Sequence, residues 1–448
     1  TAASGGSTAR RSFPSLPSPR GYPAGRAPNP RPRTGPGSPG RTGHASRFVA
    51  GRHRPSAALG DGVGENPPES PRAVVFWASA GQLAYTQLGY PVVLHAWARL
   101  RPPGPPGPDP PAPDASPRPV SLIVAAHDEE GVIGAKVADA RRLDWPADRL
   151  EVIVSCDGCT DRTADRARAA GADLVLELPR GGKIRAQDAG VAAARGELLA
   201  FSDANSTWEP DALRRLAAAF ADPAVGYACG QVRFVREDGG DNQEGLYWRY
   251  ELGLRRLESR LASVTAGNGA IYATRRESYI HVDPIMGHDL SFPFKMVKRG
   301  WRAVYVPGAR AREKMVPTID GEFSRKRRMM SHAWPIVIRG GMLSPRGYRP
   351  GYALMIFSHR ILRYASPGLH LAALAANLVL VRRGPVYVVC LAGQVLLLAA
   401  AALAGPVPAR PLLVARYYVA TTAALGLGLW DWLRHGTGPS WEAAEGTR

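Results

Sequence analysis

Short apolar runs alternate with helical stretches in the middle of the chain. The apolar runs lie at Val120–Ala126, Val152–Ser155, Leu174–Leu178 and Leu198–Ser202. The helical stretches between them lie at Glu129–Arg141, Asp161–Ala170 and Ile184–Ala194. This alternation predicts a mainly parallel sheet with right-handed crossovers, so we expect an α/β domain over residues 120–340. In such sheets, ligands bind at the carboxyl ends of the strands.

A longer helical pattern follows the predicted strands. Apolar residues recur at helical spacing and predict an amphipathic helix, its apolar face formed by Leu246, Tyr250, Leu254, Leu257 and Leu261. Glu251 and Arg255 stand at the favourable i,i+4 spacing and are expected to pair on this helix.

Four apolar segments flank the α/β region. Ala73–Ala98 carries no formal charge and is long enough to span a bilayer. A signal peptide is a poorer explanation, because the segment lies far from the N-terminus and no small-residue cleavage site follows it. Three further segments, near 364–381, 385–404 and 411–430, predict three transmembrane helices over residues 364–430. Arg416 is costly inside the last segment unless it snorkels or pairs.

The remaining segments are polar or amphipathic. Residues 1–72 are rich in Pro, Gly, Ser and Arg, cannot bury enough apolar surface to fold, and are predicted to be disordered. Residues 99–119 form a Pro-rich linker, residues 341–363 an interfacial amphipathic segment, and residues 431–448 a C-terminal tail.

The net charge of +19 invites a nucleic-acid interpretation, but the charge is badly placed for it. Residues 1–72 hold eleven arginines against three acidic residues, so much of the excess lies outside the predicted domain. We therefore expect no nucleic-acid partner. The abundance of Arg, Ala, Gly and Pro over Lys is typical of a bacterium with a GC-rich genome.

Four cysteines, at positions 156, 159, 229 and 390, are too few and too scattered for a disulfide framework. Cys156 and Cys159 form a CxxC pair, but no second CxxC or paired His follows. A structural role is therefore favoured over metal or redox chemistry for this pair, and the domain is expected in a reducing compartment.

Acidic or basic clusters follow all four of the predicted strands. Asp157 directly follows the second strand, where a base edge could donate hydrogen bonds to it. Asp161 and the pair Glu129-Glu130 are more simply explained as helix caps and dipole partners. Gly181-Gly182-Lys183 opens a helix, an arrangement that suits a diphosphate, although this motif alone is common.

Asp203 and Asn205 lie one residue apart at the end of the fourth strand. Such oxygen ligands suit Mg²⁺ or Mn²⁺ bridging phosphates. In isolation, a turn is the better explanation of this pair.

The order and spacing of these motifs resemble the family 2 glycosyltransferases, the group that includes cellulose, chitin and hyaluronan synthases. Residues 120–130 are similar to their opening strand, Ser155–Asp161 to their base-binding loop, and Ser202–Asn205 to their metal motif. The resemblance continues through four later segments and covers residues 73–442. These segments are Tyr247–Glu251, Gly267–Ala273, His288-Asp289 and Arg325–Arg328.

The resemblance implies a Rossmann-like nucleotide-sugar-binding domain of the GT-A type, with transmembrane helices. It implies that Asp289 is the catalytic base and that Asp203 and Asn205 hold the metal. The donor-binding residues that it implies are Ala126, Asp128, Asp157 for uracil, Lys183 for the phosphates, Asp203, Arg325 and Arg328.

The chain departs from the family pattern at several positions. Asp128 stands where Asn is common, Asn205 replaces the last Asp of the metal motif, and His288 replaces an acidic residue. The neutral Asn205 should weaken metal binding. Arg325–Arg328 could equally be a basic helix face at anionic lipid, and no Trp directly follows Arg328, which argues against processive polymerisation.

The sequence thus predicts an inverting glycosyltransferase of the bacterial plasma membrane, multi-pass, with a cytoplasmic catalytic domain. Its partners would be a nucleotide-sugar donor, a glycan or lipid acceptor, and membrane lipid. We expect the donor to be a UDP-sugar. The predicted products are cell-surface polysaccharide or glycolipid. A catalytically silent membrane scaffold is the alternative, but it would not need Asp157, Asp203 and Asp289 together.

The topology of the first apolar segment stays open. If it spans once and the domain is cytoplasmic, the basic tail lies outside, against the positive-inside tendency. Three alternatives stay open: the tail is translocated, the segment lies in the interface, or the true start lies downstream.

Overall fold

The structure is a computed structural model that describes residues 70–101, 117–235, 245–314, 319–407 and 409–438. These residues all belong to the compact unit Asn66–Arg448. The basic tail before residue 70, most of the Pro-rich linker and the last ten residues lie outside the described part of the chain, so the predictions for them stay predictions.

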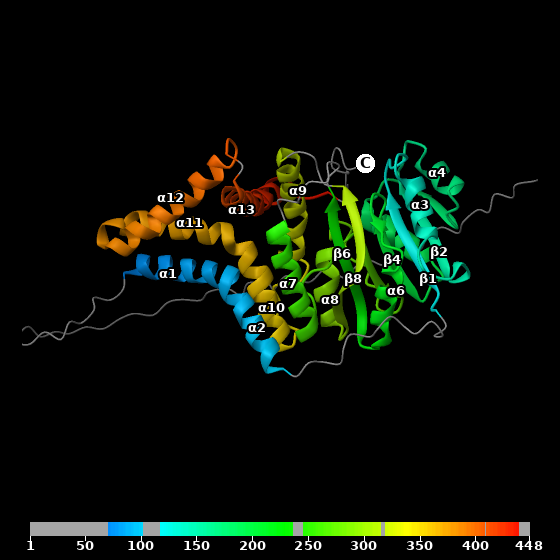
Figure 1. The fold of residues 1–448 in the computed structure, drawn as a ribbon, viewed down its shortest axis with the longest axis horizontal. Helices are drawn as coiled ribbons and strands as arrows, with labels where there is room; N and C mark the ends of the chain where they lie inside the picture. The colour runs from blue at the N-terminus through cyan, green and yellow to red at the C-terminus, as the bar shows by residue number, and fades with distance from the viewer. Residues whose placement is uncertain (1–69, 102–116, 236–244, 315–318, 408, 439–448) are drawn as a thin grey trace, which may run out of the picture. The chain divides into compact units, whose positions relative to one another are not determined.

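The described residues form one sheet of eight strands in the order β3-β2-β1-β4-β7-β6-β8-β5 (Figure 1). The strands are β1 Val120–Ala126, β2 Leu150–Asp157, β3 Leu174–Leu178, β4 Leu198–Asp203, β5 Thr207–Trp208, β6 Val225–Val235, β7 Ile271–Arg275 and β8 Arg302–Lys314. The predicted parallel half is confirmed, because β3, β2, β1 and β4 pair in parallel. Beyond β4 the sheet is mixed, since β7 is antiparallel to both β4 and β6, whereas β6 and β8 are parallel.

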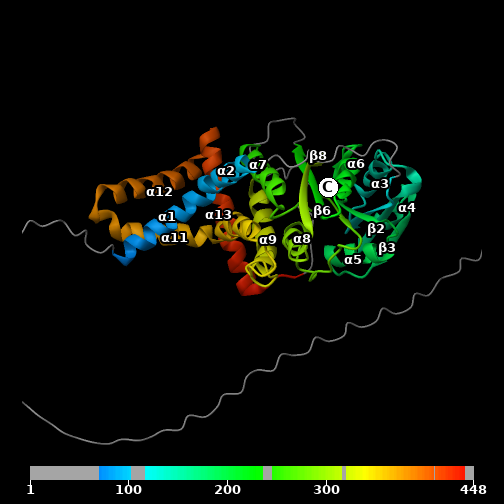
Figure 2. The ribbon, with the colours of Figure 1, turned by 90° about the horizontal axis from the view of Figure 1, so that it is seen from below.

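Helices cover both faces of the sheet. The helices on one face are α3 Ile133–Arg141, α4 Thr163–Ala169 and α6 Ala212–Ala218, and those on the other are α5 Lys183–Ala193 and α8 His288–Lys298 (Figure 2). Alternation along β1 explains both layers, because Leu122 and Val124 pack toward α3 while Ile123 packs toward α5. Short 3₁₀ turns lie at Ala147–Arg149 and Ala219–Ala221. Because helices cover both faces of the sheet, β1 is apolar along almost its whole length.

The predicted amphipathic helix is α7, Gly245–Leu261, but its charged residues are not on the surface. Glu251 and Arg255 are both buried, and the expected pair between them does not form. Glu251 instead pairs with Arg363, and the Arg255 guanidinium lies over the ring of Tyr305. Helical spacing alone could not show this, because the covering helix comes from a distant part of the chain.

That covering helix begins at Pro350. It runs through α10 Pro350–Met355, the π-helical turn η4 Ile356–Ile361, and α11 Leu362–Leu380, ending in a 3₁₀ turn at Val381–Arg383. The sequence divided this stretch at residue 363 into an interfacial segment and a membrane helix. No helix end lies there: one continuous helix contains both predicted segments, and its residues Tyr352, Met355 and Ile356 pack into a core shared with α7 and α8.

A buried group of charges joins this helix to α7. We call Glu251, Glu258, His359 and Arg363 the helix-linking cluster. His359 Nδ1 lies 2.6 Å from Glu258 Oε1, and its Nε2 lies 3.3 Å from Glu251 Oε2. Arg363 Nη1 lies 2.5 Å from Glu251 Oε1. Every carboxylate of the cluster therefore faces a cationic or donating group, as burial requires.

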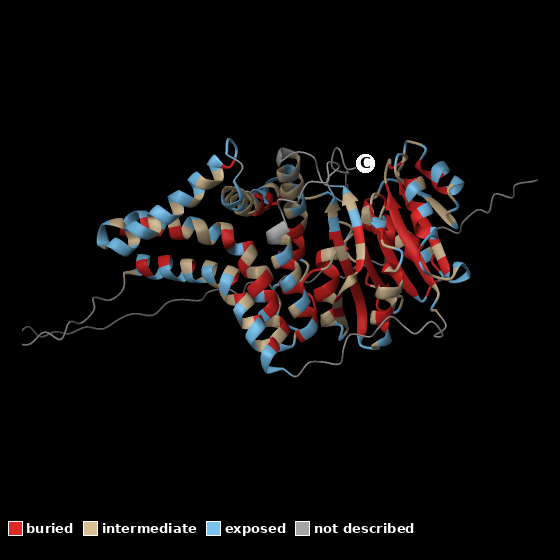
Figure 3. Ribbon diagram, viewed as in Figure 1, coloured by how far each residue is buried: buried red, intermediate tan, exposed pale blue. Residues whose placement is uncertain are grey.

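Three helices of the described residues are long and apolar enough to cross a membrane: Pro350–Arg383, α12 Pro385–Leu403 and α13 Arg410–His435. Helix α12 exposes apolar side chains on most of its surface (Figure 3). An exposed apolar surface of this extent is typical of a helix in contact with lipid.

The first apolar segment forms α1 Pro71–Ala84, a π-helical turn Tyr85–Gly89 and α2 Tyr90–Leu100. It is not among the three spans above. Phe76 packs with α11, whereas Tyr90 and Leu94 are buried in the core that contains α7. Its predicted membrane span stays a prediction. Helix α9, Ile319–Ile338, packs against α13.

Candidate functional site

The polar clusters meet at the edge of the sheet where β1, β2 and β4 end. Register places Asp203 beside Ala125 of β1, and Ala126 beside Cys156 of β2. Ala126, one of the predicted donor-binding residues, is fully buried at the end of its strand. The strand β8 runs in the same direction as β4, so its end, Glu313-Lys314, reaches the same edge.

Asp157 is buried and braces the glycine loop that precedes α5. Its Oδ1 accepts hydrogen bonds from the backbone N–H groups of Gly181 at 2.6 Å and Gly182 at 3.0 Å, and Arg180 Nε lies 3.8 Å from Oδ2. Gly158 has φ +60° and packs so closely on Arg180 that a Cβ would lie 2.8 Å from its side chain. Positioning of the loop is thus what Asp157 does here, and contact with a base stays a prediction.

Lys183, the first residue of α5, forms an ion pair with Asp203 at the end of β4. Burial alone would lower the pKa of Lys183, but the charges of Asp203, Asp289 and Glu313 outweigh it and raise the pKa. The amine therefore stays protonated at neutral pH. A protonated lysine at a helix N-terminus is well placed for an anionic ligand.

Asp289 lies beside this pair, in the first turn of α8. A Cβ on Gly269 would be 3.9 Å from both Asp289 Cβ and Lys183 Nζ, so the two side chains flank this glycine. A Cβ on Gly287 would lie 2.7 Å from Asp289 Oδ1, so a larger residue there would displace this carboxylate. Gly287 occupies the N-cap of α8, so Asp289 does not cap the helix. The structure thus brings Asp289, Lys183 and Asp203 together.

His288, which precedes Asp289, is buried away from solvent. Tyr272 Oη lies 2.7 Å from His288 Nδ1, and the imidazole stacks on Phe292 at 3.9 Å. Burial, and then the charge of Lys183, hold the pKa of His288 well below its ordinary value. The ring is therefore neutral and cannot replace the carboxylate that the family pattern has here.

The loop after β1 is held by the loop after β2. Asp128 adopts φ 50°, and its Oδ1 accepts a hydrogen bond from the Thr160 N–H at 2.7 Å. Asp161 Oδ1 accepts one from the Thr163 N–H at 3.0 Å, although Arg162 occupies the N-cap itself. These hydrogen bonds fix the positions of the two loops at the edge of the sheet where a ligand would bind.

His127, Asp128 and Cys159 could together offer three metal ligands within 4.8 Å of one another, which the sequence pattern did not suggest. His127 Nδ1 lies 2.8 Å from the Asp157 carbonyl oxygen, and Cys159 Sγ lies 3.5 Å from that of Ala126. All four cysteines are free thiols. These contacts with backbone oxygens give the group a role in holding the loops.

Sequence reasoning missed two residues beside Asp203. The turn that holds Asn205 leads into β5, whose Thr207 pairs with Arg312, so Glu313 of β8 lies next to this turn. Lys136 of α3 is buried, and its Nζ donates to the Ser206 carbonyl oxygen at 2.7 Å. Burial lowers the pKa of Lys136 to about 8. Burial and the nearby charge of Asp203 raise the pKa of Glu313 to about 7.

The basic run of α9 is divided among different surroundings. Arg325 is close enough to Glu313 to act on its charge. Arg327 pairs with Asp431 of α13 at 2.6 Å, whereas Arg328 is exposed. Of the two predicted donor residues in this run, the structure therefore brings only Arg325 near the strand ends. Trp334 is buried, and its indole N–H donates to the Leu425 carbonyl oxygen.

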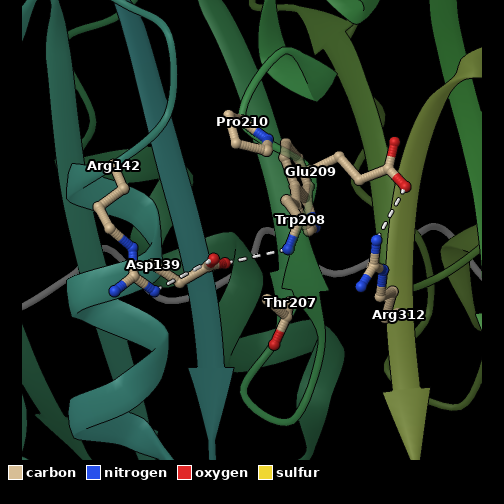
Figure 4. A pocket seen from close by; sticks show the side chains of 7 residues that line it. All are labelled: Asp139, Arg142, Thr207, Trp208, Glu209, Pro210 and Arg312. Carbon is tan, nitrogen blue, oxygen red and sulfur yellow. Dashed lines mark hydrogen bonds and ion pairs between the residues drawn. The ribbon is translucent and has the colours of Figure 1, made fainter. Parts of the chain in front are cut away.

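A cavity of about 280 Å³ lies at the β5 edge, and neither Lys183 nor Asp203 is among the residues that line it (Figure 4). Asp139 Oδ2 accepts a hydrogen bond from the Trp208 N–H at 3.0 Å, and Glu209 lies 3.6 Å from Arg312. These polar groups satisfy each other. The cavity therefore lacks the convergent, unsatisfied groups that mark the strand-end site.

The strand-end cluster combines a lysine at a helix N-terminus, carboxylates on strand ends and a carboxylate in a helix first turn. Oxygen donors of the kind that Mg²⁺ or Mn²⁺ prefers lie beside cations that suit phosphates. With the mixed eight-stranded sheet, this arrangement defines a glycosyltransferase domain of the GT-A type.

Comparison with known proteins agrees with this class. A mannosyltransferase from Pyrobaculum calidifontis, solved in complex with GDP-Man and Mn²⁺, has the same fold with a TM-score of 0.65. It is 23% identical, and the match covers 82% of this chain and 99% of that one.

Residues 121–282 match the model of Glycosyl transferase family 2, and this part of the chain is a family 2 glycosyltransferase domain. A beta-monoglucosyldiacylglycerol synthase of Synechocystis is 37% identical over 123 residues, 25% of this chain and 26% of that protein. An N-acetylglucosaminyltransferase of Rhizobium meliloti is 28% identical over 234 residues, 47% of this chain and 54% of that protein. The matches thus span about a quarter and about half of these relatives.

Proposed function

We propose that this protein transfers a sugar from a nucleoside diphosphate sugar to a hydroxyl acceptor, with inversion at the anomeric carbon. The convergence of Lys183, Asp203 and Asp289 carries the proposal. These three residues come from α5, β4 and α8, and a fold without catalysis would not need to place their charges together. The alternative of a silent scaffold predicts no such convergence.

Asp289 would act as the general base. It removes the proton of the acceptor hydroxyl while the hydroxyl oxygen forms its bond to the anomeric carbon. The bond between that carbon and the diphosphate oxygen breaks in the same displacement, so no covalent intermediate forms and the configuration inverts. Asp289 is held in place because its backbone carbonyl accepts a 2.6 Å hydrogen bond from the Gly267 N–H.

Lys183 would neutralise charge on the departing diphosphate, and Arg325 would add to this field. Asp203 and Asn205 would hold a divalent cation, and the P. calidifontis mannosyltransferase contains Mn²⁺. Such an ion supplies Lewis-acid stabilisation of the leaving phosphate. The donor set fits, because Asp203 is a partly exposed carboxylate at a strand end and Asn205 follows it in the same turn.

The acceptor would be a lipid or a glycan at a bacterial plasma membrane, with the domain on the cytoplasmic side. A hydrogen-bonded path supports this, because Arg360 of the apolar helix Pro350–Arg383 donates to Thr265 at 2.9 Å. Thr265 precedes Gly267, which holds Asp289. The backbone of the base is thus hydrogen-bonded to a loop that is itself attached to a helix apolar enough to cross the membrane. A glycolipid synthase among the relatives points to the same class of acceptor.

Released nucleotide tests the proposal. Membranes containing the protein are incubated with Mn²⁺ and, in parallel, with UDP-sugars, GDP-mannose and CMP-sugars. We expect UDP release from at least one UDP-sugar, and inversion in the NMR spectrum of the product. Faster turnover of GDP- or CMP-sugars would contradict the UDP preference alone. Absence of turnover with every donor would support the scaffold instead.

A further inference from the structure

Glu313 stands out as a carboxylate at the end of an apolar row. Alternate residues of β8, Ala309 and Ala311, are buried in the core beneath α6, and Glu313 is next in this row. Side chains of one row point to one face, so Glu313 is directed inward where an apolar residue would be expected. Its Oε1 is shielded from solvent and accepts no hydrogen bond from any described residue.

The register of the sheet brings this carboxylate to the turn after β4. Thr207 pairs with Arg312 and Trp208 with Ala311 in antiparallel register, so the next position of β8, Glu313, lies opposite Ser206. Ser206 directly follows Asn205, and its N–H donates to the Asp203 carbonyl oxygen at 3.2 Å. Neighbouring strands lie about 5 Å apart, which is within the reach of a glutamate side chain.

The charges around Glu313 belong to the same site. Asp203, Lys183, Arg325 and Lys136 are all close enough to act on its carboxylate. Lys136 also donates to the carbonyl oxygen of Ser206, the residue that lies opposite Glu313. Glu313 is therefore part of the wall of the strand-end site. The other acid of this strand pair, Glu209, faces Arg310 and Arg312 instead.

Charge count explains why such a residue is useful here. Asp203 contributes one negative charge and Asn205 contributes none, a weak set for a divalent cation, whose affinity increases with the number of charged ligands. A second carboxylate from β8 restores the missing charge without a second Asp in the turn.

We propose that Glu313 is the second anionic ligand of the divalent cation, completing a site with Asp203 and Asn205. The proposal rests on the proposed function, because it concerns the cation of that site. It adds a residue from a strand that the metal motif does not include. Binding of the cation would direct Glu313 Oε1 to the ion and release Lys183 from Asp203 toward the donor diphosphate.

The test measures cation binding without turnover. Full-length protein in detergent is titrated with Mn²⁺, and free Mn²⁺ is followed by electron paramagnetic resonance, with no sugar donor present. Glu313→Gln should raise the Kd for Mn²⁺ roughly 10-fold or more. The matched control Glu209→Gln removes an equal charge from the same strand pair and should leave the Kd within about twofold.

A charge relocation sharpens the result. Asn205→Asp, combined with Glu313→Gln, returns the second carboxylate to the turn and should recover most of the lost affinity. If Glu313 only anchors Lys183 and Lys136, Glu313→Gln would leave the Kd unchanged and the relocation would recover nothing, which overturns the proposal. Glu313→Asp, which keeps the charge, should bind more tightly than Glu313→Gln, and it serves if the glutamine variant does not fold.

Failure here is distinguishable from failure of the proposed function. If the wild type binds Mn²⁺ and Glu313→Gln binds it equally well, the role of Glu313 is wrong while sugar transfer stands. If the wild type binds no Mn²⁺ but still releases nucleotide, the cation site is wrong and transfer again stands. Only the loss of nucleotide release from every donor removes the enzyme activity itself.

Discussion

The protein holds two clusters of opposite charges that differ in how complete they are. The donor cluster, Lys183, Asp203 and Glu313, lies at the strand ends, and Glu313 Oε1 accepts no hydrogen bond from the described residues. The helix-linking cluster lies between α7 and the helix that begins at Pro350, and its carboxylates are saturated by His359, Arg363, Tyr90 and Thr265.

This difference indicates that the donor cluster is a binding site, whereas the helix-linking cluster holds two helices together. Burial without partners is costly, so a cluster that stays buried must complete itself from the chain. A cluster that awaits a charged ligand can leave its groups partly exposed and unsatisfied. The pKa values follow the same division: Glu251 and Glu258 are held below their ordinary value, whereas the pKa of Glu313 is raised.

The largest effect is expected in the helix-linking cluster. Glu258→Gln removes a buried carboxylate that accepts from Tyr90 and Thr265 and lies 2.6 Å from His359 Nδ1, and should cost about 3–5 kcal/mol of unfolding free energy. Chemical unfolding of the protein in detergent measures this. The exposed Glu277→Gln should change the stability by less than about 0.5 kcal/mol. An equally small effect of Glu258→Gln would show that the helix-linking cluster does not contribute to stability.

In the donor site, Asp289→Asn should lower the transfer rate roughly 100-fold or more, because the amide cannot accept the acceptor proton. Stability and nucleotide binding should hardly change. Asp283→Asn, at an exposed position in the loop before α8, is the matched control and should transfer sugar normally. Near-normal turnover of Asp289→Asn would remove this residue from the mechanism.

A smaller effect is expected from Asp157→Asn. The amide group cannot accept hydrogen bonds at both of its positions, so the Gly181-Gly182 loop should loosen at a cost of about 1–3 kcal/mol. If Asp157 only braces this loop, KM should rise equally for UDP- and GDP-sugars. If Asp157 instead contacts the base, the ratio of the KM for UDP-sugars to the KM for GDP-sugars should change.

The smallest effects are shifts in pH dependence, and the two clusters should differ in direction. Burial alone would raise the pKa of Glu251, but Arg363 and His359 outweigh it and hold the pKa well below 4.5. Its contribution to stability is present above pH 4.5 and is lost as the pH falls through the lowered value. Glu251→Gln should therefore weaken the protein at neutral pH and remove part of its acid sensitivity.

In metal-free buffer, the stability contributed by Glu313 should depend on pH in the opposite direction to that of Glu251. Its pKa is raised from 4.5 to about 7, so the folded protein favours the protonated form. The stability that this group contributes is thus fully present below pH 4.5 and is lost as the pH rises through about 7. Melting temperatures measured across this window should decline more for the wild type than for Glu313→Gln. Parallel curves would show that the carboxylate is already satisfied.

The sequence by itself determined the α/β domain and the apolar helices after it. Alternating strands and helices predict the parallel half of the sheet, because a strand that is covered on both faces must be apolar throughout. Motif order placed Asp157, Lys183 and Asp203 at strand ends, and the carboxyl ends of parallel strands necessarily share an edge. Asp289 came from the family resemblance, not from the pattern of strands.

Only the tertiary structure decided which distant residues complete each cluster. Glu313 meets the turn after Asp203 because the strand order places β8 against β5, and no local pattern reports that order. Glu251 has Arg255 one helical turn away, yet it pairs with Arg363 because a helix from the far end of the chain covers α7. Local periodicity shows which face of an element is buried, whereas partners across that face depend on chain segments that meet only on folding.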